Sequence, residues 1–365
     1  MSDNIEKLLA EPAFMPYEEK ALLFLAAMRD SVLFHKKNCV FYATFLSANA
    51  FDGRVDNLAD IPPLPIGIFK KRTLLSVPQS DIVKMTHSSA TTSGTPSSIS
   101  IDRVTRERQR TALSKIMSSL LGGERRPFVI FDSRSVVEST AEELSSRATT
   151  IRGLLAFSSG FFCLLDSELQ LRASVLQEAL KKMDGRSPVF FGVTTILYEI
   201  FQKYKHDRDV RALLKEFPHP TVLFSGGWKK LASMNIDHES FKKGLAEFFS
   251  VARNDLIDFY GMIEQPGVIY PECAYGYKHV PAYAEVIIRD LRSMRPLGAS
   301  QEGMIEVLSP LAHSYPGIAL LTDDIGSLGG NDGCTCGRRG QFFSFVRRAP
   351  EAETKGCADA LELPP

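Results

Sequence analysis

The sequence has no excess of charge of either sign and few cysteines. Its 365 residues include 43 Lys plus Arg and 43 Asp plus Glu, so the formal net charge is zero. This balance removes the usual electrostatic argument for a nucleic-acid partner or an anionic membrane surface. Six cysteines are too few for a disulfide scaffold, so we expect a protein of a reducing compartment.

Long hydrophobic runs are missing as well. No segment offers about 18 uninterrupted apolar residues, so we expect no membrane-spanning helix. The first residues, MSDNIEKLLAEPAF, carry acidic groups where a signal peptide would need a basic start and an apolar core. Because 44% of the residues are apolar, the chain can bury one large core or several subdomains. We therefore expect a globular, cytoplasmic protein.

The pattern of apolar residues changes twice along the chain. Residues 17–50 have helical spacing until 61-IPPLPIGIF-69 interrupts with three prolines. From about 103 to 250, short apolar runs alternate with amphipathic ones, which predicts βαβ units and a mainly parallel sheet. After 268, shorter runs separated by turn residues predict an antiparallel β subdomain. The expected parts are 1–85 (helical), 86–267 (α/β core), 268–345 (β subdomain) and 346–365 (mobile tail).

The segment 87-HSSATTSGTPSSISID-102 is the most unusual in composition. Eleven of its sixteen residues are Ser, Thr, Gly or Pro, and it lies between an expected strand and an expected helix that starts near 103. Composition alone favours a solvated linker. Backbone N–H groups, the flexible Gly94 and the neighbouring hydroxyls would also suit a phosphate. No Gly-Lys-Ser/Thr follows, so the segment is not a Walker A loop.

Five segments resemble, in order, the motifs of the adenylate-forming enzymes, which activate a carboxylic acid with ATP as an acyl-adenylate. They are 91-TTSGTPS-97, 224-FSGGWKK-230, 258-DFYGMIEQ-265, 321-LTDDIG-326 and 336-CGRRG-340. Within this group the chain looks most like the bacterial acyl-protein synthetases of the LuxE type, with phenylacetate-CoA ligases as nearer relatives than most. The resemblance implies an α/β fold, the large N-terminal-type domain of these enzymes, with parallel sheets plus a β subdomain and with the C-terminal lid largely absent.

The same resemblance implies a site for ATP and Mg²⁺. The residues around the nucleotide would be Thr92, Ser93, Gly94 and Thr95 at the phosphates, Gly226 and Gly227 on the adenine side, and Tyr260 and Gly261 against the adenine. Thr95 and Glu264 would act in catalysis, with Glu264 as the Mg²⁺ ligand, because Mg²⁺ needs few protein carboxylates beside substrate phosphates. Asp324 would accept the ribose hydroxyls, and Arg338 would complete that contact.

A late cysteine, Cys357, suggests the acyl acceptor. The resemblance implies that this thiol takes the acyl group from the adenylate and delivers it to a partner acyl reductase or transferase. Only 27 residues follow Arg338 in the 365-residue chain, whereas a typical lid domain has about 100. We therefore favour self-transfer over a conventional CoA ligase. Transfer to CoA, a carrier protein or an amine remains open, as does a non-catalytic adenylate-binding scaffold subunit.

The acid substrate is less clearly indicated by the residues. The resemblance implies a fatty acid. Phe190, Phe191 and Trp228 would suit an acyl pocket, although aromatic residues beside expected strands belong more often to the core.

Three cysteines and a histidine have the composition of a zinc site. They are Cys273 and His279 in 273-CAYGYKH-279, and Cys334 and Cys336 in 334-CTC-336. Three thiols and one imidazole match a four-coordinate structural site, from which 54 intervening residues would loop out as the β subdomain. The alternative is a small core cysteine, a satisfied histidine and two unpaired thiols. The sequence leaves both open.

Overall fold

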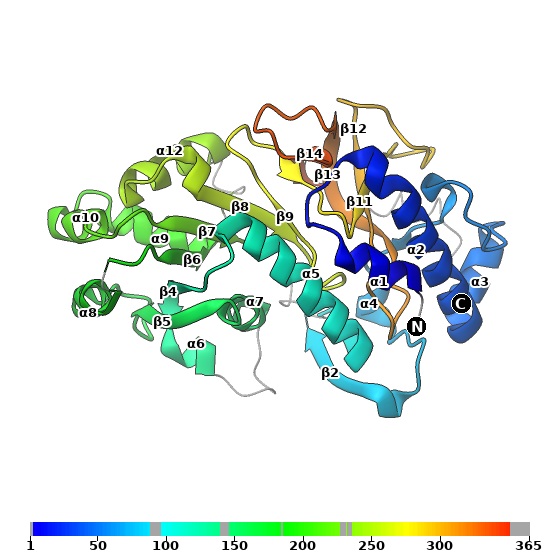
Figure 1. The fold of residues 1–365 in the computed structure, drawn as a ribbon, viewed down its shortest axis with the longest axis horizontal. Coiled ribbons are helices and arrows are strands. Elements are labelled where there is room, and N and C mark those ends of the chain that lie inside the picture. The colour runs from blue at the N-terminus through cyan, green and yellow to red at the C-terminus, as the bar shows by residue number, and fades with distance from the viewer. Residues whose placement is uncertain are drawn as a thin grey trace. The chain divides into compact units, whose positions relative to one another are not determined.

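The computed structural model describes residues 3–87, 96–138, 146–183, 185–226, 231 and 236–350. They form two compact units (Figure 1). Unit 1 comprises Met1–Ser119, Gly261–Tyr270 and Tyr275–Pro365, and unit 2 comprises Leu120–Tyr260 and Pro271–Ala274. Among the described residues, no helix is long and apolar enough to cross a membrane.

The N-terminal part of unit 1 is helical, as its apolar spacing predicts. Its helices are α1 (Asp3–Ala10), α2 (Tyr17–Asn38), α3 (Val40–Ala48), α4 (Ile68–Lys71) and α5 (Arg103–Leu121), with short 3₁₀ turns at Leu58–Asp60 and Gln79–Asp81. The long helix α2 follows Pro16, carries Glu18 and Glu19 in its first turn, and ends with Lys36 and Lys37. These charges oppose the helix dipole at both ends and so stabilise the helix.

The sheet of unit 1 confirms the predicted antiparallel β subdomain. Its strands are β10 (Lys278–His279), β11 (Glu285–Arg289), β12 (Glu302–Leu308), β13 (Ala319–Asn331) and β14 (Gln341–Arg348), in the order β10-β14-β13-β12-β11. All neighbouring pairs along this path are antiparallel. The proline-rich interruption also adds a short strand, β1 (Leu64–Pro65), which pairs parallel to β13.

A β-hairpin surrounds the Ser/Thr-rich segment of unit 1. Strand β2 (Ile82–His87) pairs antiparallel with β3 (Ser98–Asp102), so the second half of the segment 87–102 is a strand and not the loop that we expected. Ile99 and Ile101 are buried, and their alternation with serines gives the period of two that a strand requires. This strand is hard to predict from the sequence because serine dominates the composition of the segment.

Unit 2 has the parallel α/β architecture that the alternating runs predict. Its strands are β4 (Arg126–Ser133), β5 (Ser158–Leu165), β6 (Val189–Val193), β7 (Thr221–Ser225) and β8 (Leu256–Gly261), in the order β5-β4-β6-β7-β8. Every pair in this series is parallel. The helices are α6 (Arg134–Glu138), α7 (Ser146–Leu155), α8 (Ala173–Met183), α9 (Thr194–Tyr204), α10 (Arg208–Lys215) and α12 (His238–Phe249), with a 3₁₀ turn at Arg253–Asp255. The short strand β9 (Ile269–Pro271) follows β8 in the chain.

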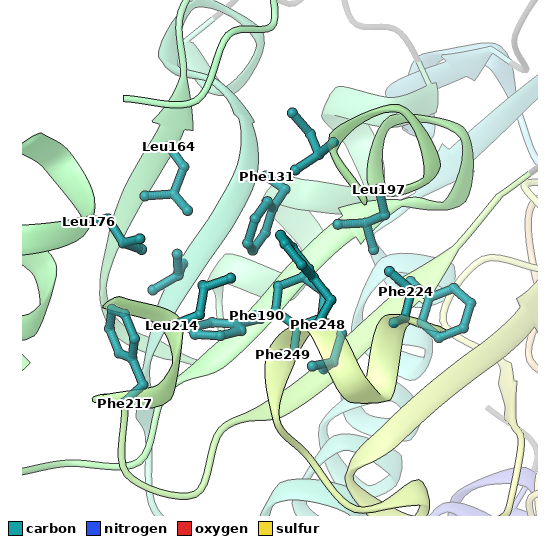
Figure 2. Close-up of a cluster of buried hydrophobic side chains, with 14 of the residues drawn as sticks. Phe131, Leu164, Leu176, Phe190, Leu197, Leu214, Phe217, Phe224, Phe248 and Phe249 are labelled. Carbon is teal, nitrogen blue, oxygen red and sulfur yellow. The ribbon is translucent and has the colours of Figure 1, made fainter. Parts of the chain in front are cut away.

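The core of unit 2 is aromatic. Figure 2 shows the rings of Phe131, Phe190, Phe217 and Phe249 gathered among leucines. Phe190 contacts three of these rings, with centroids 5.1 Å from Phe217, 5.5 Å from Phe249 and 5.9 Å from Phe131. The contacts with Phe217 and Phe131 are edge-to-face, and such contacts add to the free energy gained by burying apolar area. Phe190 and the equally buried Phe191 therefore belong to the core.

Candidate functional site

The predicted nucleotide residues divide between the two units. Unit 1 holds Glu264, Asp324 and Arg338, and unit 2 holds Gly226 and Tyr260. The predicted residues that lie outside the described ones are Thr92, Ser93, Gly94, Thr95, Gly227, Trp228 and Cys357. Gly261 ends strand β8.

Glu264 lies in a turn that unit 1 holds rigidly. The Tyr315 hydroxyl donates a hydrogen bond of 2.8 Å to the Glu264 carbonyl. The side-chain amide of Gln265 donates to the carbonyls of Val307 and Gly317, at 3.2 and 3.0 Å. Because these partners are buried, the turn has few alternative conformations.

The Glu264 carboxylate meets the downstream end of the Ser/Thr-rich segment. Its side chain is buried and shares a hydrogen bond with the side chain of Ser97. Burial raises the pKa of the Glu264 carboxyl, the Ser97 hydrogen bond opposes that shift, and Lys70 also acts to lower the pKa. A buried carboxylate of this kind is stabilised by a nearby cation. Ser97 ends the loop motif 91-TTSGTPS-97, but nothing in the sequence predicts its contact with Glu264.

Asp324 lies on β13 directly opposite Arg348 on β14. The Arg348 guanidinium is 3.4 Å from the Asp324 carboxylate and 2.7 Å from that of Asp323. The Asp324 backbone N–H donates to the hydroxyl of Thr322, which in turn donates to the Ile305 carbonyl. These contacts orient the Asp324 carboxylate from two neighbouring strands.

The arginine beside Asp324 is Arg348 and not the predicted Arg338. Arg348, which the sequence reasoning missed, contacts Asp324. Arg338, predicted for that position, has its guanidinium 4.8 Å above the Phe14 ring, and its backbone N–H donates to the Cys336 thiol. The only signal for Arg348 in the sequence is its place in a last β-rich run, which predicts no partner.

In unit 2, Gly226 and Tyr260 lie at the carboxyl ends of the adjacent parallel strands β7 and β8. Gly226 comes directly after β7 with φ of +111°, and an added Cβ would lie 2.9 Å from Val193 Cγ1. Both facts require glycine at this position. Tyr260 is half-buried near the end of β8, the strand next to β7. Ligands of open α/β sheets bind at this edge, where the strands end.

The structure brings together the four residues of the predicted zinc site. The ligand atoms of Cys273, His279, Cys334 and Cys336 all lie within 4.8 Å of one another. The Cys336 Sγ is 3.2 Å from His279 Nε2. Burial lowers the pKa of His279 to about 4, and the positive charge of Arg338 acts in the same direction. The arrangement favours the metal alternative over scattered thiols.

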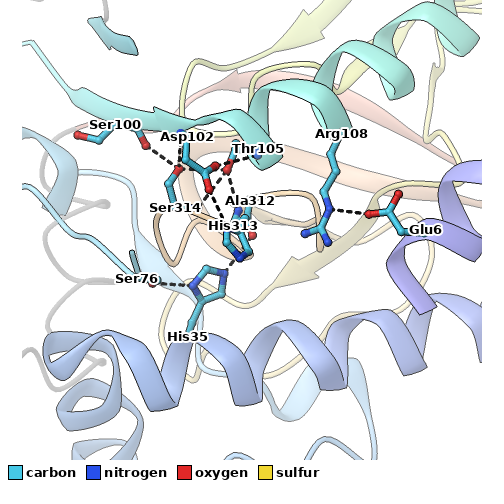
Figure 3. Close-up of polar contacts among 10 residues, drawn as sticks. All are labelled: Glu6, His35, Ser76, Ser100, Asp102, Thr105, Arg108, Ala312, His313 and Ser314. Carbon is cyan, nitrogen blue, oxygen red and sulfur yellow. Dashed lines mark hydrogen bonds and ion pairs between the residues drawn. The ribbon is translucent and has the colours of Figure 1, made fainter. Parts of the chain in front are cut away.

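A buried polar network in unit 1 was not anticipated from the sequence (Figure 3). Asp102, at the end of β3, binds His313 Nδ1 at 2.7 Å and the Thr105 backbone N–H at 2.8 Å. Burial alone would raise the pKa of Asp102, but the hydrogen bonds from His313 and Thr105 hold it at about 2. His35 Nδ1 lies 2.7 Å from the Ser76 hydroxyl, and burial lowers the pKa of His35 to about 3.

A family model for the acyl-protein synthetases called LuxE matches residues 2–363 of the chain. The chain belongs to the LuxE acyl-protein synthetase family. It is therefore a ligase, as the order of its motifs indicated.

Two curated relatives of this LuxE-family chain are described as long-chain-fatty-acid–luciferin-component ligases. The one from Vibrio harveyi is 25% identical over 382 residues, covering 98% of this chain and 92% of the relative. The one from Aliivibrio fischeri is 20% identical over 368 residues, covering 98% and 93%. The likeness thus extends over nearly the full length of both relatives.

Solved structures confirm the fold class. An open conformation of 2-hydroxyisobutyryl-CoA ligase in complex with 2-HIB-AMP and CoA aligns with a TM-score of 0.69 and 16% identity, covering 92% of this chain and 76% of that one. The same ligase in its postadenylation state with 2-HIB-AMP aligns with a TM-score of 0.68 and 15% identity, covering 92% and 69%. The LuxE-family chain therefore has the fold of an adenylate-forming ligase.

Proposed function

We propose that this protein activates a fatty carboxylic acid with ATP and Mg²⁺ as an acyl-adenylate, and then transfers the acyl group to its own Cys357. The observation that carries the adenylation step is the buried Glu264, which shares a hydrogen bond with Ser97 at the end of the Ser/Thr-rich segment. Membership of the LuxE family and the fatty-acid ligase relatives support the substrate class.

The reaction consists of two displacement steps, each of which forms one bond and breaks another. A carboxylate oxygen of the acid attacks the α-phosphorus of ATP, the bond from that phosphorus to the β-phosphate oxygen breaks, and pyrophosphate leaves. The Cys357 sulfur then attacks the acyl carbon, AMP leaves, and the thiol proton passes to solvent. The thioester would be delivered to a partner acyl reductase or transferase. Positioning and charge neutralisation supply most of the catalysis in such displacements.

Glu264 suits the single protein ligand that Mg²⁺ requires beside nucleotide phosphates. Mg²⁺ would neutralise charge that develops on the phosphates. Tyr315 and Gln265 hold the turn in place, and Ser97 orients the carboxylate. The phosphate contacts would come from Thr92, Ser93, Gly94 and Thr95, with Ser93, Gly94 and Thr95 at the β- and γ-phosphates.

Asp324 suits the ribose because a carboxylate accepts two hydroxyl protons. We assign the arginine of this contact to Arg348, which holds the Asp324 carboxylate from the opposite strand, in place of Arg338. Gly226, Gly227, Tyr260 and Gly261 would form the adenine side.

The test combines ATP–pyrophosphate exchange with intact-protein mass. Wild type, Cys357→Ser and a Cys39→Ser control are incubated with ATP, Mg²⁺ and fatty or aryl acids. We expect exchange in all three, highest with fatty acids, and a hydroxylamine-labile acyl adduct in wild type and in Cys39→Ser. Loss of the adduct in Cys357→Ser alone identifies the acceptor.

Three results would contradict parts of the proposal. Exchange without any adduct in wild type would show that the acyl acceptor is not this chain, and would favour CoA, a carrier protein or an amine. An adduct that persists in Cys357→Ser removes Cys357 as acceptor. If no acid supports exchange, the adenylation step is wrong and the alternative of a non-catalytic adenylate-binding subunit is favoured.

The site residues have their own test. Glu264→Gln should lower the exchange rate about 100-fold, because a charge that stabilises the transition state is lost. Arg348→Met should raise KM for ATP more than Arg338→Met does. The reverse order would return the ribose contact to Arg338.

A further inference from the structure

The cluster of Cys273, His279, Cys334 and Cys336 is not used by the proposed reaction. His279 is fully buried, Cys273 and Cys334 are each 8% exposed, and Cys336 is half-buried. None of the three cysteines forms a disulfide within the described part of the chain. Three thiols and an imidazole contribute little to apolar packing. Each polar atom buried among them also costs free energy unless it has a partner.

The spacing of the ligand atoms suits a tetrahedral metal. With zinc–sulfur bonds of about 2.3 Å and zinc–nitrogen bonds of about 2.0 Å, ligand atoms in a tetrahedral site stand roughly 3.5–3.8 Å apart. Here all four lie within 4.8 Å of one another, and Cys336 Sγ is 3.2 Å from His279 Nε2. Small shifts of these side chains would complete the coordination.

The turn between β13 and β14 is shaped to present two of these thiols. The Gly337 N–H donates to the Cys334 carbonyl at 2.9 Å, and Gly337 has φ of +80°, which favours glycine. The Arg338 N–H then donates to Cys336 Sγ at 3.4 Å. A backbone N–H aimed at sulfur stabilises a thiolate, the form that binds metal.

The same turn is closed at its base. The Gly340 N–H donates to the Asp332 carboxylate at 2.6 Å, and the Asp332 N–H donates to the Gly340 carbonyl at 3.0 Å. His279 belongs to β10, whose partner strand β14 begins directly after the turn. The position of Cys334 and Cys336 opposite His279 is thus set by backbone pairing as well as by the side chains.

We propose that Cys273, His279, Cys334 and Cys336 form a closed, structural zinc site. Thiolate and imidazole ligands select zinc over Mg²⁺ or Ca²⁺, which prefer oxygen. Each thiol releases its proton on binding the ion. Four protein ligands leave no open position, so the ion takes no part in acyl transfer and instead joins the β13–β14 turn to β10.

The test is metal analysis of the full-length protein, freed of any histidine tag. We expect one zinc ion per chain by mass spectrometry of the metal content, and an X-ray absorption spectrum with three sulfur neighbours and one nitrogen neighbour. Cys334→Ser and Cys336→Ser should lose most of the zinc. Cys163→Ser and Cys39→Ser change buried free cysteines outside the cluster and should retain it.

A second measurement does not depend on whether the variants fold. Chelation of zinc from the wild type should lower Tm, and added Zn²⁺ but not Mg²⁺ should restore it. Wild-type protein without zinc, with three reactive thiols at these positions, would overturn the proposal. These readouts need no ATP or acid, so their failure is distinct from failure of the proposed reaction.

Discussion

Unit 1 and unit 2 bury different kinds of side chain. Unit 2 fills its interior with aromatic rings around Phe190. Unit 1 buries ion pairs, with Lys20 Nζ 2.5 Å from the Glu285 carboxylate and Arg289 Nε 2.5 Å from that of Glu306. Among the residues of unit 2 that the structure describes, one comparable pair is found, Lys242 with Glu272.

The difference has a physical consequence. Apolar packing stabilises unit 2 in a way that is nearly independent of pH. A buried charge is costly unless it is paired, so each ion pair of unit 1 specifies one arrangement of the elements that carry it. Lys20 of α2 with Glu285 of β11, for example, fixes where this helix meets the sheet. The proposed Mg²⁺ and ribose carboxylates, Glu264 and Asp324, belong to the unit with the polar interior.

The largest expected effect is in the core of unit 2. Phe190→Ala removes a ring that contacts three other rings and leaves a cavity, which should lower the free energy of unfolding by about 4 kcal/mol. Urea unfolding measures the loss, and hydrogen exchange should quicken in β4 and β6. If hydrogen exchange quickened equally in β12 and β13, the two units would not have separate cores. Phe190→Leu is the control, because it removes less of the side chain.

The next effect tests the buried ion pair of unit 1. Glu285→Gln leaves the Lys20 ammonium buried without its counter-charge and should cost about 3 kcal/mol of unfolding free energy. Glu138→Gln is the control, because the Arg134–Glu138 pair is exposed and water screens its attraction, so its loss should change the free energy of unfolding little. If both variants unfold at the same urea concentration, the buried pair contributes no more than a surface pair.

The smallest expected effect is the change in the unfolding free energy of unit 1 for each unit of pH. Burial lowers the pKa of His35 to about 3, below its unfolded value of about 6.5. Between these two pH values the His35 side chain is protonated in the unfolded chain and neutral in the folded chain. This contribution is fully present above pH 6.5 and is lost as the pH falls, by about 1.4 kcal/mol per pH unit. Asp102, held at about 2, adds a further loss below about pH 4.

Urea unfolding between pH 7.5 and 5 checks this expectation. His35→Gln should flatten the dependence, and hydrogen exchange of the β4 and β6 amides, corrected for intrinsic rates, should change less with pH than that of β12 and β13. An unchanged slope in His35→Gln would show that other groups carry the response.

The sequence predicted elements whose signal is local. Alternating runs indicated the parallel strands β4, β6 and β7, and turn-separated runs indicated the antiparallel strands β11, β12 and β13. The strand β3 was missed because its serines resemble a linker, although Ile99 and Ile101 alternate with them. Strand β1 was missed because prolines normally end such structure, and its pairing with β13 joins residues far apart in the chain.

The sequence predicted the types of residue at the candidate site, but it did not predict which residues contact them. The sequence by itself determined that a glutamate, an aspartate, three cysteines and a histidine stand in family-like positions, because motif spacing is a property of the chain. Only the tertiary structure decided that Arg348 faces Asp324, that Ser97 meets Glu264, and that His313 binds Asp102 across 211 positions. Strand register and loop closure create these pairs, and both depend on contacts between segments that the local sequence does not connect.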